Sequence, residues 1–161
     1  MNFGYKYSIV NVAKNEKPSN TGNIGRTCVL TNSRLHLVRP FSFRLDDKLL
    51  KRSGMDYWDK VDLVIHDDMN EFLEYIKGND RVFYVETFAT NYYHELEYQD
   101  GDFFVFGKES SGINKDLVAK HNDHSIKIPM NMEIDRSLNL ANSCNIVLFE
   151  ALRQIDFPGL K

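Results

Sequence analysis

Ser19-Asn20-Thr21-Gly22-Asn23-Ile24-Gly25-Arg26-Thr27 connects a strand-like run to a helix-like run near the start of the chain. The run before it, Tyr7–Val12, is rich in apolar residues, and we predict a helix over Thr21–Asn32 after it. Side-chain oxygens of Ser, Asn and Thr accept hydrogen bonds from the unpaired amides of a helix start. The two glycines allow backbone to lie close to a ligand or to another segment of the chain.

Arg26 is the residue of this stretch that points most clearly to function. It falls about one turn into the predicted helix, where the helix macrodipole disfavours a cation. A cation in an unfavourable position indicates a role that outweighs the penalty. The alternative is an arginine that extends from the helix into solvent.

Strand-like and helix-like segments continue to alternate along the chain. The predicted strands are Tyr7–Val12, Leu35–Arg39, Val61–Ile65, Arg81–Glu86, Asp102–Phe106 and Ser125–Pro129. The predicted helices are Thr21–Asn32, Asp46–Arg52, Met69–Lys77, Asn114–Lys120 and Ser137–Ile155. Because several strands are apolar on both faces, the pattern predicts an α/β fold with a mostly parallel sheet flanked by helices. No linker-like stretch divides the chain, so we predict one domain over residues 1–161.

Composition is typical of a globular protein. The 161 residues are 42% apolar, which is enough for one hydrophobic core. No run of about 18 apolar residues occurs, so no membrane span is expected, and the first residues lack the apolar run of a signal peptide. Cys28 and Cys144 form no CxxC pair, which favours reduced, buried thiols in a cytoplasmic protein.

Charge is unevenly distributed along the chain, whose net charge is −3. A basic stretch contains Arg34, Arg39, Arg44, Lys48, Lys51 and Arg52 against only two acidic residues, and an acidic stretch follows over Asp62–Glu74. A short basic stretch on an acidic protein fits contact with a small patch of RNA better than coating of a long RNA. The alternative is an ordinary charged surface.

The last predicted helix is apolar on more than one side. One stripe at helical spacing consists of Ala141, Cys144, Leu148, Leu152 and Ile155, and three further apolar residues, Ile146, Val147 and Phe149, lie off it. Such a helix must bury more than one side, either in the core and a partner subunit or deep within its own domain.

Two further segments complete a set of three motifs with the first stretch. They are Phe104–Ile113, and Ile128–Met130 followed by Ser137–Ser143. In this order and spacing, the motifs resemble those of the SpoU-type RNA 2′-O-ribose methyltransferases of the SPOUT superfamily. Four other segments resemble the minimal, single-domain tRNA (cytidine/uridine-34 2′-O)-methyltransferases, namely Phe43–Lys48, Arg52–Tyr57, Tyr98–Asp102 and Phe149–Gln154. The resemblance covers essentially the whole chain.

The resemblance implies an α/β knot with a deep C-terminal trefoil knot, a homodimer and S-adenosyl-L-methionine as cofactor. It places the cofactor at Val85, Thr87, Gly107, Ile128 and Ser137, with Glu109 and Leu138 beside them. Apolar walls for the adenine would come from Ile128, Met130 and Leu138, although side chains of this kind are also ordinary core residues.

The resemblance also implies that Arg26 is catalytic, with Asn23 on the same helix. Guanidinium groups stay protonated in proteins, so an arginine is a poor proton acceptor. We therefore expect Arg26 to orient the ribose or a phosphate and to stabilise the developing alkoxide, while another group receives the proton. The expected substrate is the anticodon stem-loop of tRNA, held by Arg34, Arg44, Lys48, Lys51 and Arg52.

The chain departs from the family pattern at three places, one of which is Ala141, where serine is common. Gly25 stands where a bulky aliphatic residue is more usual, which we expect to loosen the helix, and Glu86-Thr87-Phe88-Ala89 lacks a cation that many relatives carry. Two alternatives to wobble methylation stay open: another tRNA or ribosomal RNA site, and an RNA-binding knot protein without turnover. His121-Asn122-Asp123-His124 resembles a metal-binding pattern, but it falls in a predicted turn and we expect no metal.

Overall fold

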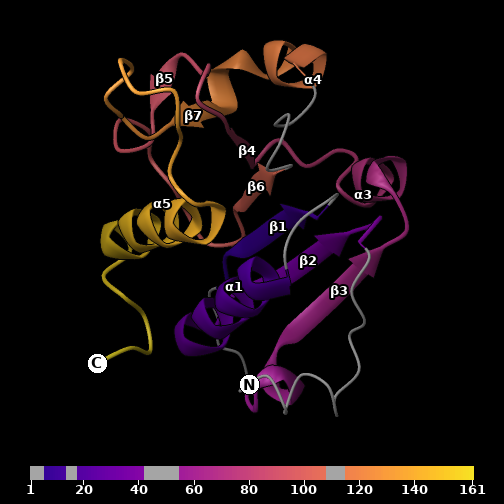
Figure 1. The fold of residues 1–161 in the computed structure, drawn as a ribbon. Helices are drawn as coiled ribbons and strands as arrows, with labels where there is room; N and C mark the ends of the chain where they lie inside the picture. The colour runs from indigo at the N-terminus through magenta and orange to yellow at the C-terminus, as the bar shows by residue number, and fades with distance from the viewer. Residues whose placement is uncertain (1–5, 14–17, 42–54, 108–114) are drawn as a thin grey trace.

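The computed structural model describes residues 6–13, 18–41, 55–107 and 115–161. Strands form a central sheet that helices cover on both faces (Figure 1). The predicted helix Asp46–Arg52 lies outside the described residues.

The sheet has seven strands, and all of its pairings are parallel, as the apolar character of the strands predicts. Its strands are β1 (Ser8–Val12), β2 (Arg34–Val38), β3 (Asp62–His66), β4 (Val82–Val85), β5 (Asn91–Tyr92), β6 (Phe103–Gly107) and β7 (Ser125–Lys127). Their order is β3-β2-β1-β6-β4-β7-β5. Six of them match predicted strands, and the two-residue β5 was not predicted.

Strands β6 and β7 are each inserted between strands that precede them in the chain. β6 lies between β1 and β4, and β7 lies between β4 and β5. The α/β prediction with a parallel sheet is confirmed, while the deep trefoil knot stays a prediction.

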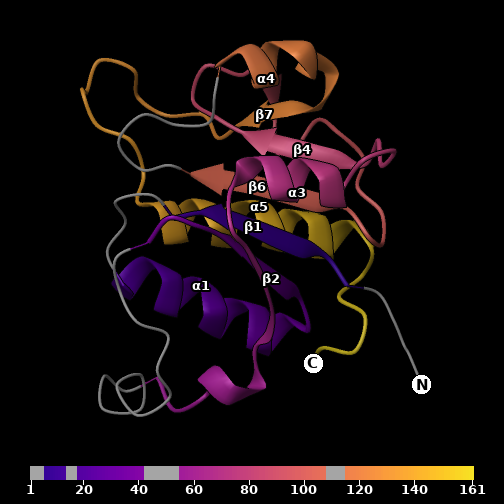
Figure 2. The same cartoon turned by 90° about the vertical axis from the view of Figure 1, so that its right-hand side faces the viewer.

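Helices pack on the two faces of the sheet and create two hydrophobic clusters. The helices are α1 (Pro18–Thr31), α3 (Met69–Tyr75), α4 (Lys115–Lys120) and α5 (Leu140–Gln154), with the short 3-10 helices η1 (Trp58–Lys60) and η2 (Asn122–His124). Figures 1 and 2 show α1 and α5 on one face and α3 on the other. The larger cluster joins Ile9 and Phe104 of the sheet to Cys28 of α1 and Leu148 of α5. The smaller cluster sets Phe72 of α3 and Val118 of α4 on Val10 and Val105.

Helix α1 begins earlier than predicted. Its first residue is Pro18, which suits a first turn because proline has no amide hydrogen and its φ is fixed near the helical value. Arg26 therefore lies in the middle of α1 and not one turn from its start, so the argument from an unfavourable macrodipole is wrong.

Helix α5 is shorter than predicted at both ends. It begins at Leu140, and Asn139 caps it by accepting a hydrogen bond from the amide of Asn142 at 3.2 Å. Ser137 and Leu138 thus precede the helix, and Ile155 follows its last turn.

The predicted apolar stripe of α5 is buried from Ala141 to Leu152. Val147 is also fully buried, so the buried side is wider than the stripe. Phe149 is 45% exposed and lies on a second, uncovered side of the helix.

A buried histidine pair links β2 to β3 beneath α3. His36 and His66 are almost fully buried, and their Nδ1 and Nε2 atoms lie 3.0 Å apart, so one ring donates a hydrogen bond to the other. Burial, together with the neighbouring His66, lowers the pKa of His36 to about 4, and burial also lowers the pKa of His66. Nε2 of His36 has no hydrogen-bond partner among the described residues. Both histidines therefore resist protonation while the protein is folded.

The free energy of unfolding should fall as the pH is lowered from about 6.5 to about 4. Unfolded histidines take up protons near pH 6.5, whereas folded His36 stays neutral down to about pH 4. Each pH unit in this window lowers the free energy of unfolding by up to about 1.4 kcal/mol for each histidine that stays neutral in the folded protein. Urea unfolding above and below the window measures the effect. The double variant His36→Leu with His66→Leu should flatten the dependence, exposed His94→Leu should keep it, and a flat wild-type profile would contradict the prediction.

Candidate functional site

The carboxyl ends of three neighbouring strands bring together four of the eight predicted cofactor positions. Val85 ends β4, Gly107 ends β6 and Ile128 directly follows β7. β4 lies between the other two strands, and the amide of Glu86 donates to the carbonyl of Ile126 at 2.9 Å. Val85 and Ile128 are half-buried, and Thr87 is exposed beyond the end of β4. Glu109 lies outside the described residues.

Gly107 is required for a reason that the sequence did not reveal. Its φ is +108°, and a Cβ atom built on it would lie 2.5 Å from the carbonyl oxygen of Val12 at the end of β1. Any side chain would therefore clash with β1 and strain the backbone, whether or not a ligand is bound.

The segment between β7 and α5 carries the remaining cofactor positions. Met130 is half-buried, Ser137 is exposed and Leu138 is 40% exposed. Leu138 is therefore not an ordinary core residue. These partly exposed apolar side chains and the adjacent strand ends offer both apolar surface and backbone hydrogen-bonding groups to a ligand.

Amide side chains connect α1 to this segment and to β1. The side chain of Asn139 donates to Oδ1 of Asn20 at 3.1 Å, and the side chain of Asn11 donates to Oγ1 of Thr21 at 3.4 Å. Asn20 is only 4% exposed, whereas the predicted catalytic Asn23 is exposed. Sequence reasoning treated Asn20 only as a possible cap, although a polar side chain within a motif next to glycines was a usable signal.

Arg26 lies in a different environment from the cofactor positions. It is exposed on α1, six residues beyond Asn20, which corresponds to about 9 Å along the helix axis. It lines a hollow of about 280 Å³ together with Val29, Leu30, Asp56 and Tyr57.

Tyr57, one of the lining residues, is anchored to α1. Its hydroxyl donates to the carbonyl of Gly22 at 2.7 Å. Burial raises the pKa of the Tyr57 hydroxyl, and the nearby Arg26 guanidinium acts in the opposite direction. The hydroxyl is thus protonated at neutral pH, as its hydrogen bond to the Gly22 carbonyl requires.

The two glycines of α1 make room for the segment that carries Tyr57. A Cβ atom on Gly22 would lie 2.6 Å from the Met55 side chain, and one on Gly25 would lie 2.5 Å from the ring of Trp58. The space left by Gly25 is therefore filled by Trp58, which is 7% exposed. The expectation that Gly25 loosens the helix is wrong, because the ring of Trp58 packs where a larger side chain would stand.

Arg34 lies away from both groups of residues. It begins β2, at the amino-terminal edge of the sheet, and its Nε lies 3.2 Å from Asp62, which also pairs with Lys6 at 2.9 Å. Arg39, at the opposite end of β2, is exposed and lies over the ring of Phe41 at 4.7 Å. Arg44, Lys48, Lys51 and Arg52 lie outside the described residues.

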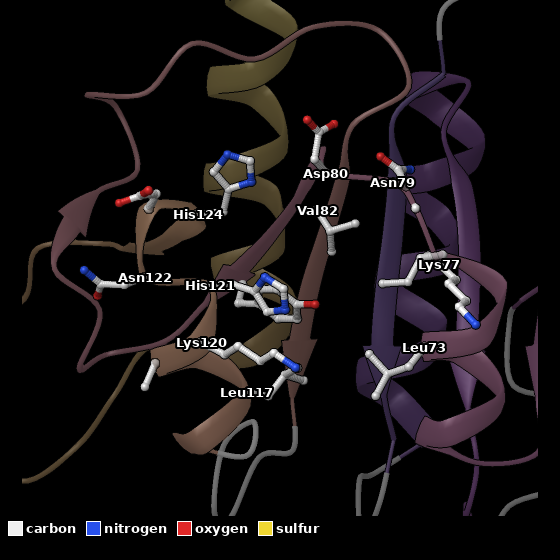
Figure 3. A pocket seen from close by; sticks show the side chains of 15 residues that line it. Leu73, Lys77, Asn79, Asp80, Val82, Leu117, Lys120, His121, Asn122 and His124 are labelled. Atoms are coloured by element: carbon white, nitrogen blue, oxygen red, sulfur yellow. The ribbon is translucent and has the colours of Figure 1, made fainter.

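A larger pocket of about 790 Å³ lies between α3 and α4, on the face of the sheet opposite α1. Figure 3 shows Leu73 and Lys77 on one wall and Lys120 and His121 on the other. Its lysines are matched by Asp80 and Asp123, so its lining has no excess charge. This pocket contains no predicted site residue.

The two histidines of the sequence pattern that resembles a metal site pack against aromatic rings of β4. His121 stacks on Tyr84 and His124 stacks on Phe83, with ring centroids 5.4 and 4.6 Å apart. Within the described ranges, no group of three or more metal-ligating side chains is found. Over the same residues, no helix has the length and apolar character of a membrane span.

Comparison with known proteins agrees with this arrangement. Residues 8–149 match the model of the SpoU rRNA Methylase family. The chain belongs to the SpoU family. The resemblance seen in the three motifs is thereby confirmed.

Two curated SpoU relatives and one solved structure are similar over most of their lengths. A Bacillus subtilis (strain 168) protein, provisionally named tRNA (cytidine(34)-2′-O)-methyltransferase, is 47% identical over 91% of this chain and 92% of its own. A Methylovorus glucosotrophus (strain SIP3-4) tRNA (cytidine(34)-2′-O)-methyltransferase is 41% identical over 89% of this chain and 93% of its own. A structure described as giving insights into 2-OH methylation of C/U34 on tRNA matches with a TM-score of 0.83 and 37% identity, over 95% of this chain and 99% of that one.

Gly25→Val should lower the free energy of unfolding by about 1–3 kcal/mol, because the added side chain clashes with the ring of Trp58. Asn23→Val, at an exposed position of the same helix, is the matched control for the helix propensity of valine. Denaturant unfolding of both variants measures the difference. Equal losses in the two variants would show that the Trp58 contact does not constrain Gly25.

Proposed function

We propose that this SpoU protein transfers a methyl group from S-adenosylmethionine to the ribose 2′-hydroxyl of the wobble nucleotide, cytidine or uridine 34, of tRNA. The observation that carries the proposal is the similarity over about nine-tenths of the chain to relatives named for this reaction. The fold and the clustering of cofactor positions at one edge of the sheet agree with it.

The residues at the carboxyl edge of the sheet fit the cofactor. Ile128, Met130 and Leu138 present partly exposed apolar surface that suits an adenine, and the ends of β4 and β6 present backbone groups beside it. When bound, S-adenosylmethionine supplies an electrophilic methyl group on a sulfonium. In this proposal Val85, Thr87, Gly107 and Ser137 complete the cofactor-binding set, to which the resemblance adds Glu109.

Arg26 acts on the RNA and not on the cofactor. Its planar guanidinium can donate to two oxygens at once, so it holds the ribose or an adjacent phosphate and stabilises charge on the 2′-oxygen as the proton leaves. Because a guanidinium is not a base, another group accepts that proton. The 280 Å³ hollow beside Arg26 gives room for part of a nucleotide.

A single-stranded loop is the form of RNA that this site suits. Loops expose unstacked bases and 2′-hydroxyls, which a small protein can recognise locally. We propose that the basic stretch after β2 contacts the anticodon stem-loop, and Arg39 stands at its start on the carboxyl edge of the sheet. We propose that the protein acts in the cytoplasm, where tRNA is found. Recovery of the protein from another compartment would contradict this location.

The proposal also includes a homodimer through the last helix, α5. Phe149 is 45% exposed on this helix, so α5 carries apolar surface that is uncovered in one chain. Helix α1 lies beside α5, with the Thr27 hydroxyl donating to Asn145 at 2.7 Å. A second subunit would cover Phe149 and would lie close to the helix that carries Arg26.

Phe149→Asp should shift the protein toward the monomer and lower its activity in parallel, because a carboxylate would be buried in the interface without a partner. Light scattering at micromolar concentration measures the mass. Tyr75→Asp is the matched control, since Tyr75 is also exposed but lies on α3, on the opposite face. A wild-type mass equal to one chain of 18.8 kDa would contradict the dimer.

Incubation with S-adenosylmethionine and tRNA, followed by mass-spectrometric mapping, should place a new 2′-O-methyl group on nucleotide 34. Arg26→Ala and Arg26→Lys should both lose most turnover, because lysine keeps the charge and lacks the planar fork. Calorimetry should show near-normal cofactor binding in both variants and weakened binding in Leu138→Asp.

Each other outcome has a defined meaning. Methylation elsewhere in tRNA or in ribosomal RNA would move the assignment to that site. Binding of RNA without transfer would favour a non-catalytic binding protein. Full turnover in Arg26→Lys would reduce the role of Arg26 to that of a point charge.

A further inference from the structure

We propose that Asp56 reads the base of the methylated nucleotide by accepting a hydrogen bond from the 4-amino group of cytidine in the hollow beside Arg26. This inference rests on the proposed function and names a specificity-determining residue for it. It predicts a preference for cytidine over uridine at the wobble position.

The hollow combines the surfaces that a nucleobase needs. Val29 and Leu30 supply apolar side chains from α1, and Tyr57 adds an aromatic ring to the lining. Unstacked bases in RNA loops are recognised by such surfaces, together with hydrogen bonds to their polar edges. Arg26 and Asp56 are the two charged residues of this lining. If Arg26 holds the ribose, the base attached to that ribose falls next to it, within the same hollow.

The backbone at Asp56 is fixed relative to α1 by its neighbours on both sides. Met55 fills the space above Gly22, the Tyr57 hydroxyl bonds to the Gly22 carbonyl and Trp58 fills the space above Gly25. The amide of Trp58 also donates to the carbonyl of Met55 at 3.1 Å, which closes a turn around Asp56. A group held in this way is preorganised for recognition and needs little ordering when a ligand binds.

The side chain of Asp56 is exposed, and no residue of the described part of the chain forms an ion pair with it. We therefore assign it the role of a hydrogen-bond acceptor for a ligand. An ionised carboxylate only accepts hydrogen bonds. Cytosine presents an amino donor at its 4-position, whereas uracil presents a carbonyl acceptor there. The carboxylate therefore pairs with cytosine and repels uracil, and a contact of this kind discriminates by at least about fivefold.

The test uses two anticodon stem-loops that differ only in C34 or U34, and the ratio of their kcat/KM values is measured. Wild-type protein should favour C34 by at least about fivefold. Asp56→Asn should lower this ratio to about one or invert it, because an amide can donate to the 4-carbonyl of uracil. Asp59→Asn, an exposed carboxylate three residues further along, should keep the wild-type ratio.

The outcomes separate this inference from the function on which it rests. Methylation of nucleotide 34 with a wild-type ratio near one would overturn the role of Asp56 and leave the proposed function standing. An equal loss on both stem-loops in Asp56→Asn would place Asp56 at the ribose or the proton, and would also overturn base reading. A changed dimer dissociation constant with an unchanged ratio would show that a second subunit occupies the hollow. No methylation of position 34 in either RNA would remove the proposed function itself.

Discussion

Insertion of β6 between β1 and β4 is the constraint on which the rest of the structure depends. At the amino end of β6, the fully buried carboxylate of Asp102 accepts hydrogen bonds from Arg81 at 2.8 and 2.9 Å, which aligns the starts of β4 and β6. At the other end, Gly107 lies against the carbonyl of Val12. Loss of Arg81 would leave the buried carboxylate of Asp102 without a partner, and any side chain at Gly107 would strain the backbone. Either change would destabilise the fold, so both ends of β6 tolerate little substitution.

This insertion also determines where ligands can be held. It brings the carboxyl ends of β1, β6 and β4 to one edge, which is where parallel sheets commonly hold ligands. The pair Asn20 and Asn139 then ties the starts of α1 and α5 to the same edge. From there α1 carries Arg26 away to a second region, so the proposed site has a cofactor part and an RNA part within one chain. A nucleotide bound across both parts would unite them.

The sequence predicts the local structure of this protein well and its long-range contacts poorly. Parallel strands covered on both faces are continuous apolar runs, so six of them could be located by pattern alone. The two residues of β5 become a strand only through pairing with Ile126 and Lys127 of β7, which no local pattern shows. Likewise, the sequence predicted that Gly25 would loosen α1, because no local pattern shows that its packing partner is Trp58, 33 residues later. Arg34 looked like part of one basic surface, but its place at the start of β2 turns it toward Asp62.

The two parts of the site are held by different physical means. On the cofactor side, strand ends and a glycine backbone provide the framework, so many side chains there can change while hydrogen-bonding groups stay in place. On the RNA side, the framework consists of side chains, because Met55, Tyr57 and Trp58 pack onto two glycines of α1. Their packing shapes the hollow beside Arg26, so larger or smaller side chains at these three positions would change that hollow. Under the proposed roles, substrate preference can change at this segment while the strand ends that would bind the methyl donor stay in place.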